Sequence, residues 1–405
     1  MARLAVLSYH TSPLAQPGTG DGGGMNVYVR ELSSALARQG HEVDVYTRRD
    51  NPQVRDVAPV EPGFRVHHVT AGPATPIARD AFTSYIDEFT ESVATSFRCS
   101  GTPDALHANY WLSGLAGHRL KHELQIPLVM TFHTLERVKA HTFESESDER
   151  ALEEAAIFNC ADAVLASCDV EADQFVRFYN AEPSRVHVVP LGVQHSFFAP
   201  GFRPQARRAL AIDPAATMLL FVGRLQALKG VDLALETLIE MRARGSNAIL
   251  AIVGGPSGPE GRATLAQLHD RVADAGVIEY VKFVAPQAHQ LLSTWMRAAD
   301  VTLVPSRAES FGLVALESSA CGTPVVASDV GGLSTLIEPG VNGVLVSQRN
   351  PRAWADAVEV VLDTERAMTM STGAVLLAQR YTWANAATRL ATLVEGLAAS
   401  RLVRC

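Results

Sequence analysis

Short apolar runs alternate with amphipathic stretches of helical length along almost the whole chain, and no other feature constrains the fold as much. Strands separated by helix-length segments form βαβ units, whose parallel sheets carry helices on both faces. The first series of expected strands is 4–8, 41–47, 65–69, 105–107, 127–133, 163–167 and 186–190. The second series is 218–224, 248–255, 281–285, 301–306, 324–328 and 343–346. The pattern predicts an α/β protein with two open parallel sheets.

A proline- and glycine-containing stretch without strand character, 192–214, separates the two series. Such stretches mark domain boundaries. We predict an N-terminal domain over 1–195, a C-terminal domain over 196–383, and a final helical segment, 384–405, that packs back on the first domain. The expected helices include 25–38, 231–244, 288–299 and 351–362.

Charge, hydropathy and cysteine usage exclude several classes of protein. The net charge is -8, from 35 basic and 43 acidic residues, so no nucleic-acid partner is expected. No apolar run approaches the ~20 residues that a membrane-spanning helix needs. The five cysteines are scattered without a CxxC pair, which argues against a disulfide framework or a zinc site. We therefore expect a protein of the reducing cytoplasm.

A glycine-rich segment, 18–26, follows the first expected strand and opens the first expected helix. Glycines there let backbone N–H groups approach an anion, and the helix N-terminus adds a favourable dipole. The segment is not a GxGxxG motif at dinucleotide spacing after the strand, nor is it GxxxxGK[ST], and the second expected strand ends at Arg48 without the acid that binds a ribose. Both observations argue against a nicotinamide dehydrogenase. A flexible loop is the alternative interpretation.

Two cations, Arg224 and Lys229, lie in a loop bounded by Gly223 and Gly230, directly after an expected strand. Ligands of open parallel sheets bind at the carboxyl ends of the strands, so these cations are placed to clamp a diphosphate. Fixed cations would also stabilise the charge that a diphosphate gains as it leaves. Solvated surface cations are the alternative.

Two carboxylates, Glu309 and Glu317, follow another expected strand. We expect Ser310 to cap the helix between them, which leaves Glu309 just outside its N-terminus. One carboxylate would reach a sugar hydroxyl and the other a ribose diol, because a carboxylate accepts hydrogen bonds from two vicinal hydroxyls. On two carboxylates alone, a solvated pair is the simpler interpretation.

Polar and aromatic residues also follow the expected strands of the first domain. His133 and Thr134 end one strand, and Tyr110 and Trp111 follow another, as residues of a binding wall would. Arg79 and Arg150 could each bind an acceptor phosphate, because arginine matches phosphate oxygens in a fork. Either arginine could equally form a surface ion pair.

Together these motifs resemble the retaining glycosyltransferases of family 4, whose GT-B fold has two Rossmann-like domains facing across a cleft. The resemblance covers nearly the whole chain, and the Glu309/Glu317 pair and the Gly223-Arg224 and Lys229-Gly230 motifs carry it. Motifs at 10–13, 16–21, 23–28 and 109–114 are similar to a narrower group. That group transfers N-acetylglucosamine from UDP-GlcNAc to 1D-myo-inositol 3-phosphate, the first step of mycothiol synthesis. Sucrose-phosphate synthases share much of this signature.

The resemblance implies roles for individual residues. Arg224 and Lys229 would hold the UDP diphosphate, Glu309 would meet the donor sugar, and His133 would orient that sugar. The implied donor-binding residues are Gln16, Pro17, Gly24, Arg224, Lys229, Gln287, Glu309 and Glu317. The implied acceptor-binding residues are His10, Asp21, Gly22, Gly23, Gly24, Met25, Asn26, Arg79, Tyr110, Thr134 and Arg150. The family has lysine at the position of Arg79, and commonly arginine at that of Gln287.

The implied reaction is front-face transfer with retention, from a UDP-sugar to a phosphorylated polyol or sugar. No cofactor is essential in this prediction, although some relatives hold magnesium largely through backbone oxygens. The matching positions are Met296, Arg297, Ala299 and Thr323. The prediction allows a homodimer. Its competitors are a sucrose-phosphate-synthase-like transferase, a UDP-sugar epimerase of the same fold and a non-catalytic nucleotide-sugar sensor.

Overall fold

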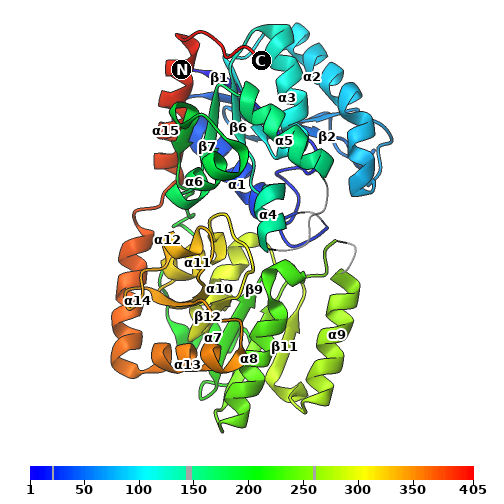
Figure 1. Ribbon diagram of the computed structural model, residues 1–405. Coiled ribbons are helices and arrows are strands. Elements are labelled where there is room, and N and C mark those ends of the chain that lie inside the picture. Colours follow the sequence, from blue (N-terminus) through cyan, green and yellow to red (C-terminus); the bar gives the residue numbers. More distant parts are fainter. Residues whose placement is uncertain (21, 143–147, 259–260) are drawn as a thin grey trace. The chain divides into compact units, whose positions relative to one another are not determined.

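The computed structural model describes residues 1–20, 22–142, 148–258 and 261–405, which form two compact units (Figure 1). The first unit comprises Met1–Ala15, Met25–Gly192 and Trp383–Cys405. The second comprises Gln16–Gly24 and Val193–Thr382. Each unit is built on a parallel sheet with flanking helices, which confirms the predicted α/β class with two Rossmann-like domains.

The sheet of the first unit has eight strands in the order β3-β4-β2-β1-β5-β6-β7-β8. These strands are β1 (Arg3–Leu7), β2 (Glu42–Arg48), β3 (Val57–Glu61), β4 (Phe64–Val69), β5 (Ala105–Asn109), β6 (Leu128–Thr131), β7 (Ala163–Ala166) and β8 (Val186–Val188). All pairs are parallel except β3 with β4, which is antiparallel. The sequence analysis did not predict β3. It is a half-exposed edge strand containing Pro59, so it lacks the apolar run of a buried strand.

Helices surround this first sheet. They are α1 (Gly24–Arg38), α2 (Ile86–Ser100), α3 (Trp111–Leu124), α4 (Glu136–Thr142), α5 (Asp148–Cys160), α6 (Asp169–Tyr179) and α15 (Trp383–Ala398), with 3-10 turns η1 (Arg79–Tyr85) and η2 (Pro183–Arg185). The central strands β1 and β5 are almost fully buried, because helices cover both faces of the sheet. Aromatic side chains fill one side of the core, where Phe132 stacks on Phe158 with ring centroids 4.3 Å apart.

The sheet of the second unit has six parallel strands in the order β11-β10-β9-β12-β13-β14. These strands are β9 (Thr217–Val222), β10 (Ala248–Val253), β11 (Val281–Val284), β12 (Val301–Val304), β13 (Val325–Ser328) and β14 (Gly343–Val346). The helices are α7 (Arg203–Ala209), α8 (Val231–Ala243), α9 (Gly261–Asp274), α10 (Leu292–Ala298), α11 (Leu313–Ala320), α12 (Leu333–Leu336), α13 (Pro351–Leu362) and α14 (Thr364–Ala378). The 3-10 turns are η3 (Ala227–Lys229), η4 (Ile278–Tyr280) and η5 (His289–Leu291).

Helix α13 shows how local sequence sets an element of the second unit. Its N-cap Asn350 accepts a hydrogen bond from the Ala353 N–H, and Pro351 occupies the first turn, where a missing N–H costs nothing. Its apolar face buries Trp354 completely among the residues of the second core. These signals are visible in the sequence, and the predicted bounds 351–362 agree with the helix.

The structure differs from the predicted organisation in four places. Gln16–Gly24 groups with the second unit, although it follows the first strand, and the first unit's main segment ends at Gly192 rather than at 195. The expected helix 288–299 is split into η5 and α10. Ser310 does not cap α11, because that helix begins later, after Gly312.

One disulfide is present, although the scattered cysteines argue against a disulfide framework. Cys160 and Cys405 are joined in a disulfide within the first unit, across 245 residues of sequence. Cys99, Cys168 and Cys321 take part in no disulfide among the described residues. No short-range spacing predicts a bond between residues so far apart, because only the fold brings them together.

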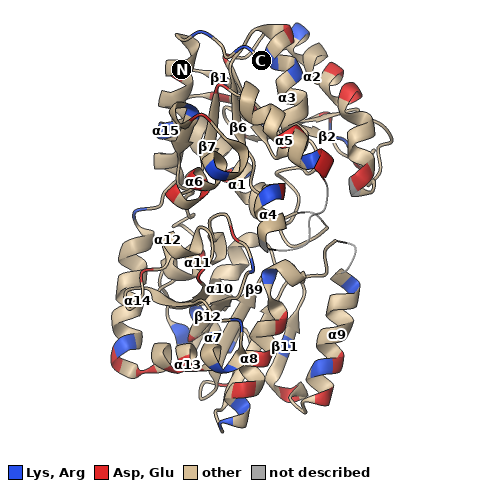
Figure 2. Ribbon diagram, viewed as in Figure 1, with Lys and Arg blue, Asp and Glu red and all other residues tan. Residues whose placement is uncertain are grey.

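Charged residues of both signs are intermixed on the outer helices in the view of Figure 2. Arg244 on α8, for example, contacts Glu240 of the same helix and both Asp356 and Glu359 of α13. Among the described helices, none is long and apolar enough to cross a membrane.

Candidate active site

The topology of the second unit places two loops side by side at the carboxyl edge of its sheet. Strand β9 lies between β10 and β12, so the chain direction of the connections reverses between β9 and β12. Ligands of open parallel sheets bind at such switch points. The loop after β9 carries Arg224 and Lys229, and the loop after β12 carries Glu309.

An ion pair joins these two loops. The Lys229 Nζ atom lies 2.7 Å from Glu309 Oε2, and both side chains are largely buried. The Ser306 hydroxyl donates to the same carboxylate oxygen at 3.1 Å. The predicted cation and the predicted carboxylate are therefore brought together and held in fixed positions.

Glycines give both loops their shape. Gly230 has φ 69°, and a side chain there would collide with the Pro305 carbonyl at the end of β12. Gly312 has φ 104° and directly precedes α11, where a Cβ atom would press on Leu333. Only glycine adopts these conformations without strain, so these residues set the approach of the two loops.

The glycine-rich segment Gln16–Gly24 lies against the same edge of the second unit. The Gln16 amide donates to the Pro286 carbonyl at 3.0 Å, and Ser257 donates to the Gly20 carbonyl at 2.7 Å. A Cβ atom at Gly23 would lie 3.5 Å from Arg224 Nε, an ordinary van der Waals contact, so the guanidinium lies beside this part of the backbone. Gly24 is similarly close to Leu313, the first residue of α11.

The second predicted carboxylate, Glu317, is buried on α11. Its Oε1 atom lies 2.6 Å from His289 Nε2, in the turn η5. The imidazole fixes the orientation of the carboxylate. Nearby, the side-chain amide of Gln287 donates to the Ala285 carbonyl at 2.8 Å.

A second group of predicted residues lies at the corresponding edge of the first unit. Strand β1 lies between β2 and β5, so its switch point is formed by the loops after β1 and β5. These loops bring His10 and Tyr110 together, with ring centroids 4.6 Å apart. Tyr110 has φ 74°, an unusual conformation for a residue with a side chain.

His133 follows the neighbouring strand β6 and also has a positive φ, 62°. Its Nε2 atom lies 3.0 Å from Asn109 Oδ1, at the end of β5. Burial, together with the nearby His107 and His10, lowers the pKa of His133 to about 3. The imidazole is therefore neutral at physiological pH. Because the amide oxygen only accepts, Nε2 carries the proton and Nδ1 is the acceptor side of the ring.

Arg150 lies in a buried cluster rather than on the surface. Its guanidinium is 2.8 Å from Glu154 and 3.3 Å from Glu136. It also donates to the Thr134 carbonyl at 3.1 Å and lies over the Tyr110 ring, 5.2 Å from its centroid. The alternative of an exposed ion pair is thus wrong, and Arg150 connects the predicted residues Thr134 and Tyr110.

The remaining predicted residues lie in helix α1, in the turn η1 and in the glycine-rich segment. Asn26, buried on α1, donates to Thr11 Oγ1 at 2.8 Å and to the Ser12 carbonyl at 2.6 Å. Asp21 lies outside the described residues, and Arg79 begins η1 without a described side chain. Three further predicted residues, Pro17, Gly22 and Met25, belong to the same segment around the glycines.

The positions expected for magnesium do not fit that ion. Magnesium prefers octahedral oxygen ligands that include carboxylates, and this set has none. The Met296 carbonyl accepts hydrogen bonds from Thr323 Oγ1 at 2.6 Å and from the Ala299 N–H at 3.2 Å. The Arg297 guanidinium, a cation, donates to the Ala199 carbonyl beside them.

Three supporting residues were not assigned roles from the sequence. His289 orients Glu317, Ser306 orients Glu309, and Asn109 orients His133. Each contacts its partner across a turn or between neighbouring strand ends. Asn109 stands in a motif of the resemblance, which marks its position. Single histidines and serines carry no such signal.

Comparison with known proteins agrees with this arrangement. The family model "Glycosyl transferases group 1" matches residues 202–374, and "Glycosyl transferase 4-like domain" matches residues 23–192. The chain is similar to the D-inositol 3-phosphate glycosyltransferase of Jonesia denitrificans, with 42% identity over 97% of this chain and 96% of that protein. It is also similar to that of Actinosynnema mirum, with 44% identity over 88% of each.

Solved structures give the same result. Sucrose-phosphate synthase from Thermosynechococcus elongatus superposes with a TM-score of 0.90 at 33% identity, over 99% of this chain and 100% of that chain. Anabaena HepE in complex with UDP and glucose shares the fold, with a TM-score of 0.78 at 19% identity over 98% of this chain and 100% of that chain. The chain is an enzyme of the GT-B fold, and it belongs to the glycosyltransferase family that includes the D-inositol 3-phosphate glycosyltransferases.

Proposed function

We propose that the enzyme transfers N-acetylglucosamine from UDP-GlcNAc to 1D-myo-inositol 3-phosphate, with retention of the anomeric configuration. Relatives that share 42% identity over 97% of this chain and 44% identity over 88% of it are named D-inositol 3-phosphate glycosyltransferase, which supports glycosyl transfer to an inositol phosphate. The observation that carries the donor half of the proposal is the pairing of Lys229 with Glu309 at the switch point of the second sheet.

The donor diphosphate would bind between Arg224 and Lys229. The diphosphate would compete with Glu309 for the Lys229 ammonium, and the released carboxylate would accept hydrogen bonds from the donor sugar. Glu317, oriented by His289, would accept from the ribose hydroxyls. The Gly23 and Gly24 amides would add donors beside Arg224.

Transfer would proceed on the face that UDP leaves. The acceptor hydroxyl attacks the anomeric carbon as the bond to the phosphate oxygen breaks, and that oxygen takes the hydroxyl proton. Arg224 and Lys229 stabilise the charge that develops on the diphosphate. His133 is neutral and can accept a hydrogen bond at Nδ1, so it orients the donor sugar and carries no proton in the reaction.

The acceptor would bind in the first unit, near His10, Tyr110 and Thr134. Glu136 and Glu154 already offset the charge of Arg150. Arg150 therefore supports this site best by holding Thr134 and the Tyr110 ring in place. Its direct contact with an acceptor phosphate stays a prediction.

A second candidate function is sucrose-phosphate synthesis, because a solved sucrose-phosphate synthase shares 33% identity and the complete fold. The test is to incubate the protein with UDP-GlcNAc or UDP-glucose, each with inositol 3-phosphate or fructose 6-phosphate. Product mass identifies the pair used, and proton NMR of the product gives the anomeric configuration. We expect one product, an α-linked N-acetylglucosaminyl inositol phosphate.

A Lys229→Ala variant tests the donor site in the same assay. Losing one cation from a leaving group costs roughly 100-fold in kcat or more by analogy with oxyanion-hole donors. Arg262→Ala, which removes an exposed cation of α9, is the matched control and should keep wild-type turnover. Full activity of Lys229→Ala contradicts the donor site, and sugar interconversion without acceptor would reveal an epimerase instead.

A further inference from the structure

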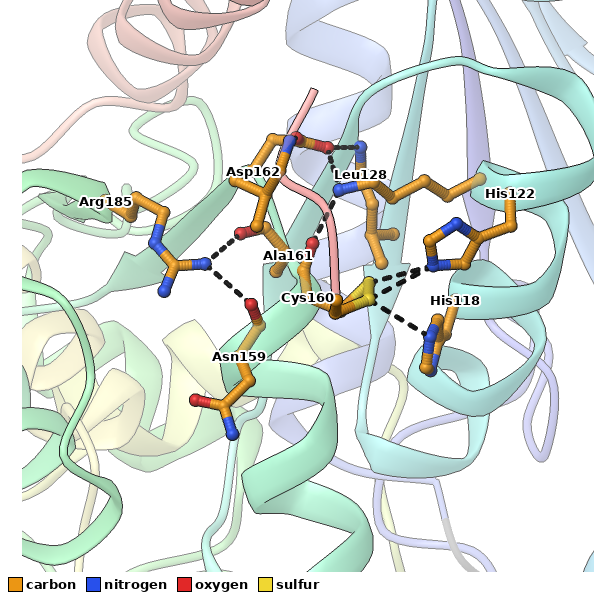
Figure 3. The surroundings of a disulfide bond; sticks show 11 residues. His118, His122, Leu128, Asn159, Cys160, Ala161, Asp162 and Arg185 are labelled. Atoms are coloured by element: carbon orange, nitrogen blue, oxygen red, sulfur yellow. Dashed lines mark hydrogen bonds and ion pairs between the residues drawn. A yellow bond between two sulfur atoms is a disulfide. The ribbon is translucent and has the colours of Figure 1, made fainter. Parts of the chain in front are cut away.

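Four potential metal ligands converge in the first unit, away from the strand ends of its sheet that carry His10 and His133. Helix α3 presents His118 and His122 one turn apart, so both rings lie on the same side of the helix. Cys160 is the last residue of α5, and the segment after α15 brings Cys405 beside it. Their ligand atoms all lie within 4.8 Å of one another (Figure 3).

The distances suit a tetrahedral metal site. His122 Nε2 lies 3.2 Å from Cys160 Sγ and 3.1 Å from Cys405 Sγ, and His118 Nε2 lies 3.6 Å from Cys405 Sγ. In a tetrahedral zinc site with Zn–N of ~2.0–2.1 Å and Zn–S of ~2.3 Å, the nitrogen and sulfur atoms are about 3.6 Å apart. The main rearrangement that a metal requires is separation of the two sulfur atoms after reduction of their bond.

The frame around the cluster does not depend on the disulfide. The buried Asp162 carboxylate accepts from the Val403 N–H at 2.7 Å and from the Leu128 N–H at 2.8 Å. The same carboxylate pairs with the buried Lys121 ammonium at 2.8 Å, and Lys121 also donates to the Cys160 carbonyl at 2.6 Å (Figure 3). These bonds hold the segment near Cys405 against α3, α5 and β6 through its backbone.

We propose that His118, His122, Cys160 and Cys405 form a Cys2His2 site for Zn²⁺ in the reduced enzyme. Each thiol releases one proton to solvent on binding, and each imidazole donates a lone pair, so the bound unit is electrically neutral. Thiolate and imidazole ligands at helical i,i+4 spacing are those that zinc prefers. The disulfide and the metal exclude each other, because a disulfide sulfur is not a thiolate.

The test uses the full chain, reduced with a phosphine, freed of metal and titrated with Co²⁺ as a spectroscopic probe. We expect one equivalent to bind with the visible bands and the sulfur-to-metal charge-transfer band of a tetrahedral cobalt thiolate. Stoichiometric Zn²⁺ should displace it. Cys405→Ser and His122→Ala should each weaken binding at least tenfold and alter the spectrum, and both side chains are exposed, so folding should survive.

Matched controls are Cys99→Ser, which removes an exposed free cysteine, and His141→Ala, which removes an exposed histidine of α4. Both should bind Co²⁺ as the wild type does. The proposal fails if the reduced wild type binds no stoichiometric metal. Cys160 and Cys405 would then serve only to form a disulfide. It also fails if Cys405→Ser and His122→Ala, folded by circular dichroism, keep the wild-type spectrum. Neither readout depends on transferase activity.

Discussion

Single polar residues in this enzyme are fixed by neighbours that the chain supplies from other loops. The Lys229 ammonium has a carboxylate 2.7 Å away, so its position is set before any ligand arrives. In the first unit, His107 and His133 are held by Thr131 and Asn109 and are kept neutral by burial. Preorganisation of this kind removes part of the cost of ordering side chains on binding.

Burial of His107 predicts a pH dependence of stability. Burial lowers the pKa of His107 to about 3, whereas an unfolded histidine has a pKa near 6.5. Between these values the unfolded chain binds the additional proton, so the free energy of unfolding falls as pH falls below about 6.5. From pH 6.5 to 5, His107 alone should remove about 2 kcal/mol.

A His107→Gln variant should therefore show a shallower loss of stability between pH 6.5 and 5 than the wild type. The measurement is the urea midpoint at each pH, and only the slope against pH is compared. The glutamine can still bond to Thr131, which limits the effect on the absolute stability. A variant with the wild-type slope would contradict the assignment of this proton to His107.

At the scale of elements, the loops after β9 and β12 owe their geometry to the strand ends and to a few glycines. The turn η3 and helix α8 follow β9 directly, and Gly230 between them lies against the Pro305 carbonyl at the end of β12. Arg349 donates to that same carbonyl at 2.8 Å. Any residue with a Cβ atom at 230 must push the two loops apart.

We expect Gly230→Ala to destabilise the protein and to reduce turnover, because Lys229 moves with the loop. Gly245→Ala is the matched control, since Gly245 also has positive φ, 83°, but no atom near its Cβ position. Both variants bear the backbone strain of roughly 1–2 kcal/mol, so the difference between them reports the collision. The measurements are the free energy of unfolding in urea and kcat. Equal losses in the two variants would contradict a collision at Gly230.

At the scale of the whole molecule, the chain does not divide in sequence order. Trp383–Cys405 returns to the first unit, where the Trp383 ring lies 5.9 Å from that of Tyr28. Helix α15 also accepts hydrogen bonds from Gln39 of the first unit, at the Ala384 carbonyl and at Thr388. Helix α15 is thus part of the first unit (Figure 1).

A Leu390→Ala variant should show how much helix α15 contributes to the stability of the first unit. Leu390 is completely buried on α15, and removing a buried leucine side chain costs about 2–5 kcal/mol. Leu152→Ala is the control, since Leu152 of α5 belongs to the same unit and is 67% exposed. That change should cost less than about 0.5 kcal/mol. Urea unfolding compares the two, and similar losses would show that α15 contributes little.

The sequence alone determined the class of fold, most strand positions and which polar residues lie in the loops after β9 and β12. Periodicity reports burial on both faces of a sheet, and a residue that directly follows a strand must lie at the sheet's carboxyl edge. That reasoning placed Lys229, Glu309 and His133 correctly at strand ends.

Contacts between distant segments were decided only by the tertiary structure. The pairing of His289 with Glu317, the grouping of Gln16–Gly24 with the second unit and the meeting of Cys160 with Cys405 have no local signal. Each depends on how helices pack over the sheets. A local pattern reports which side of an element is buried, but not which distant residue covers it.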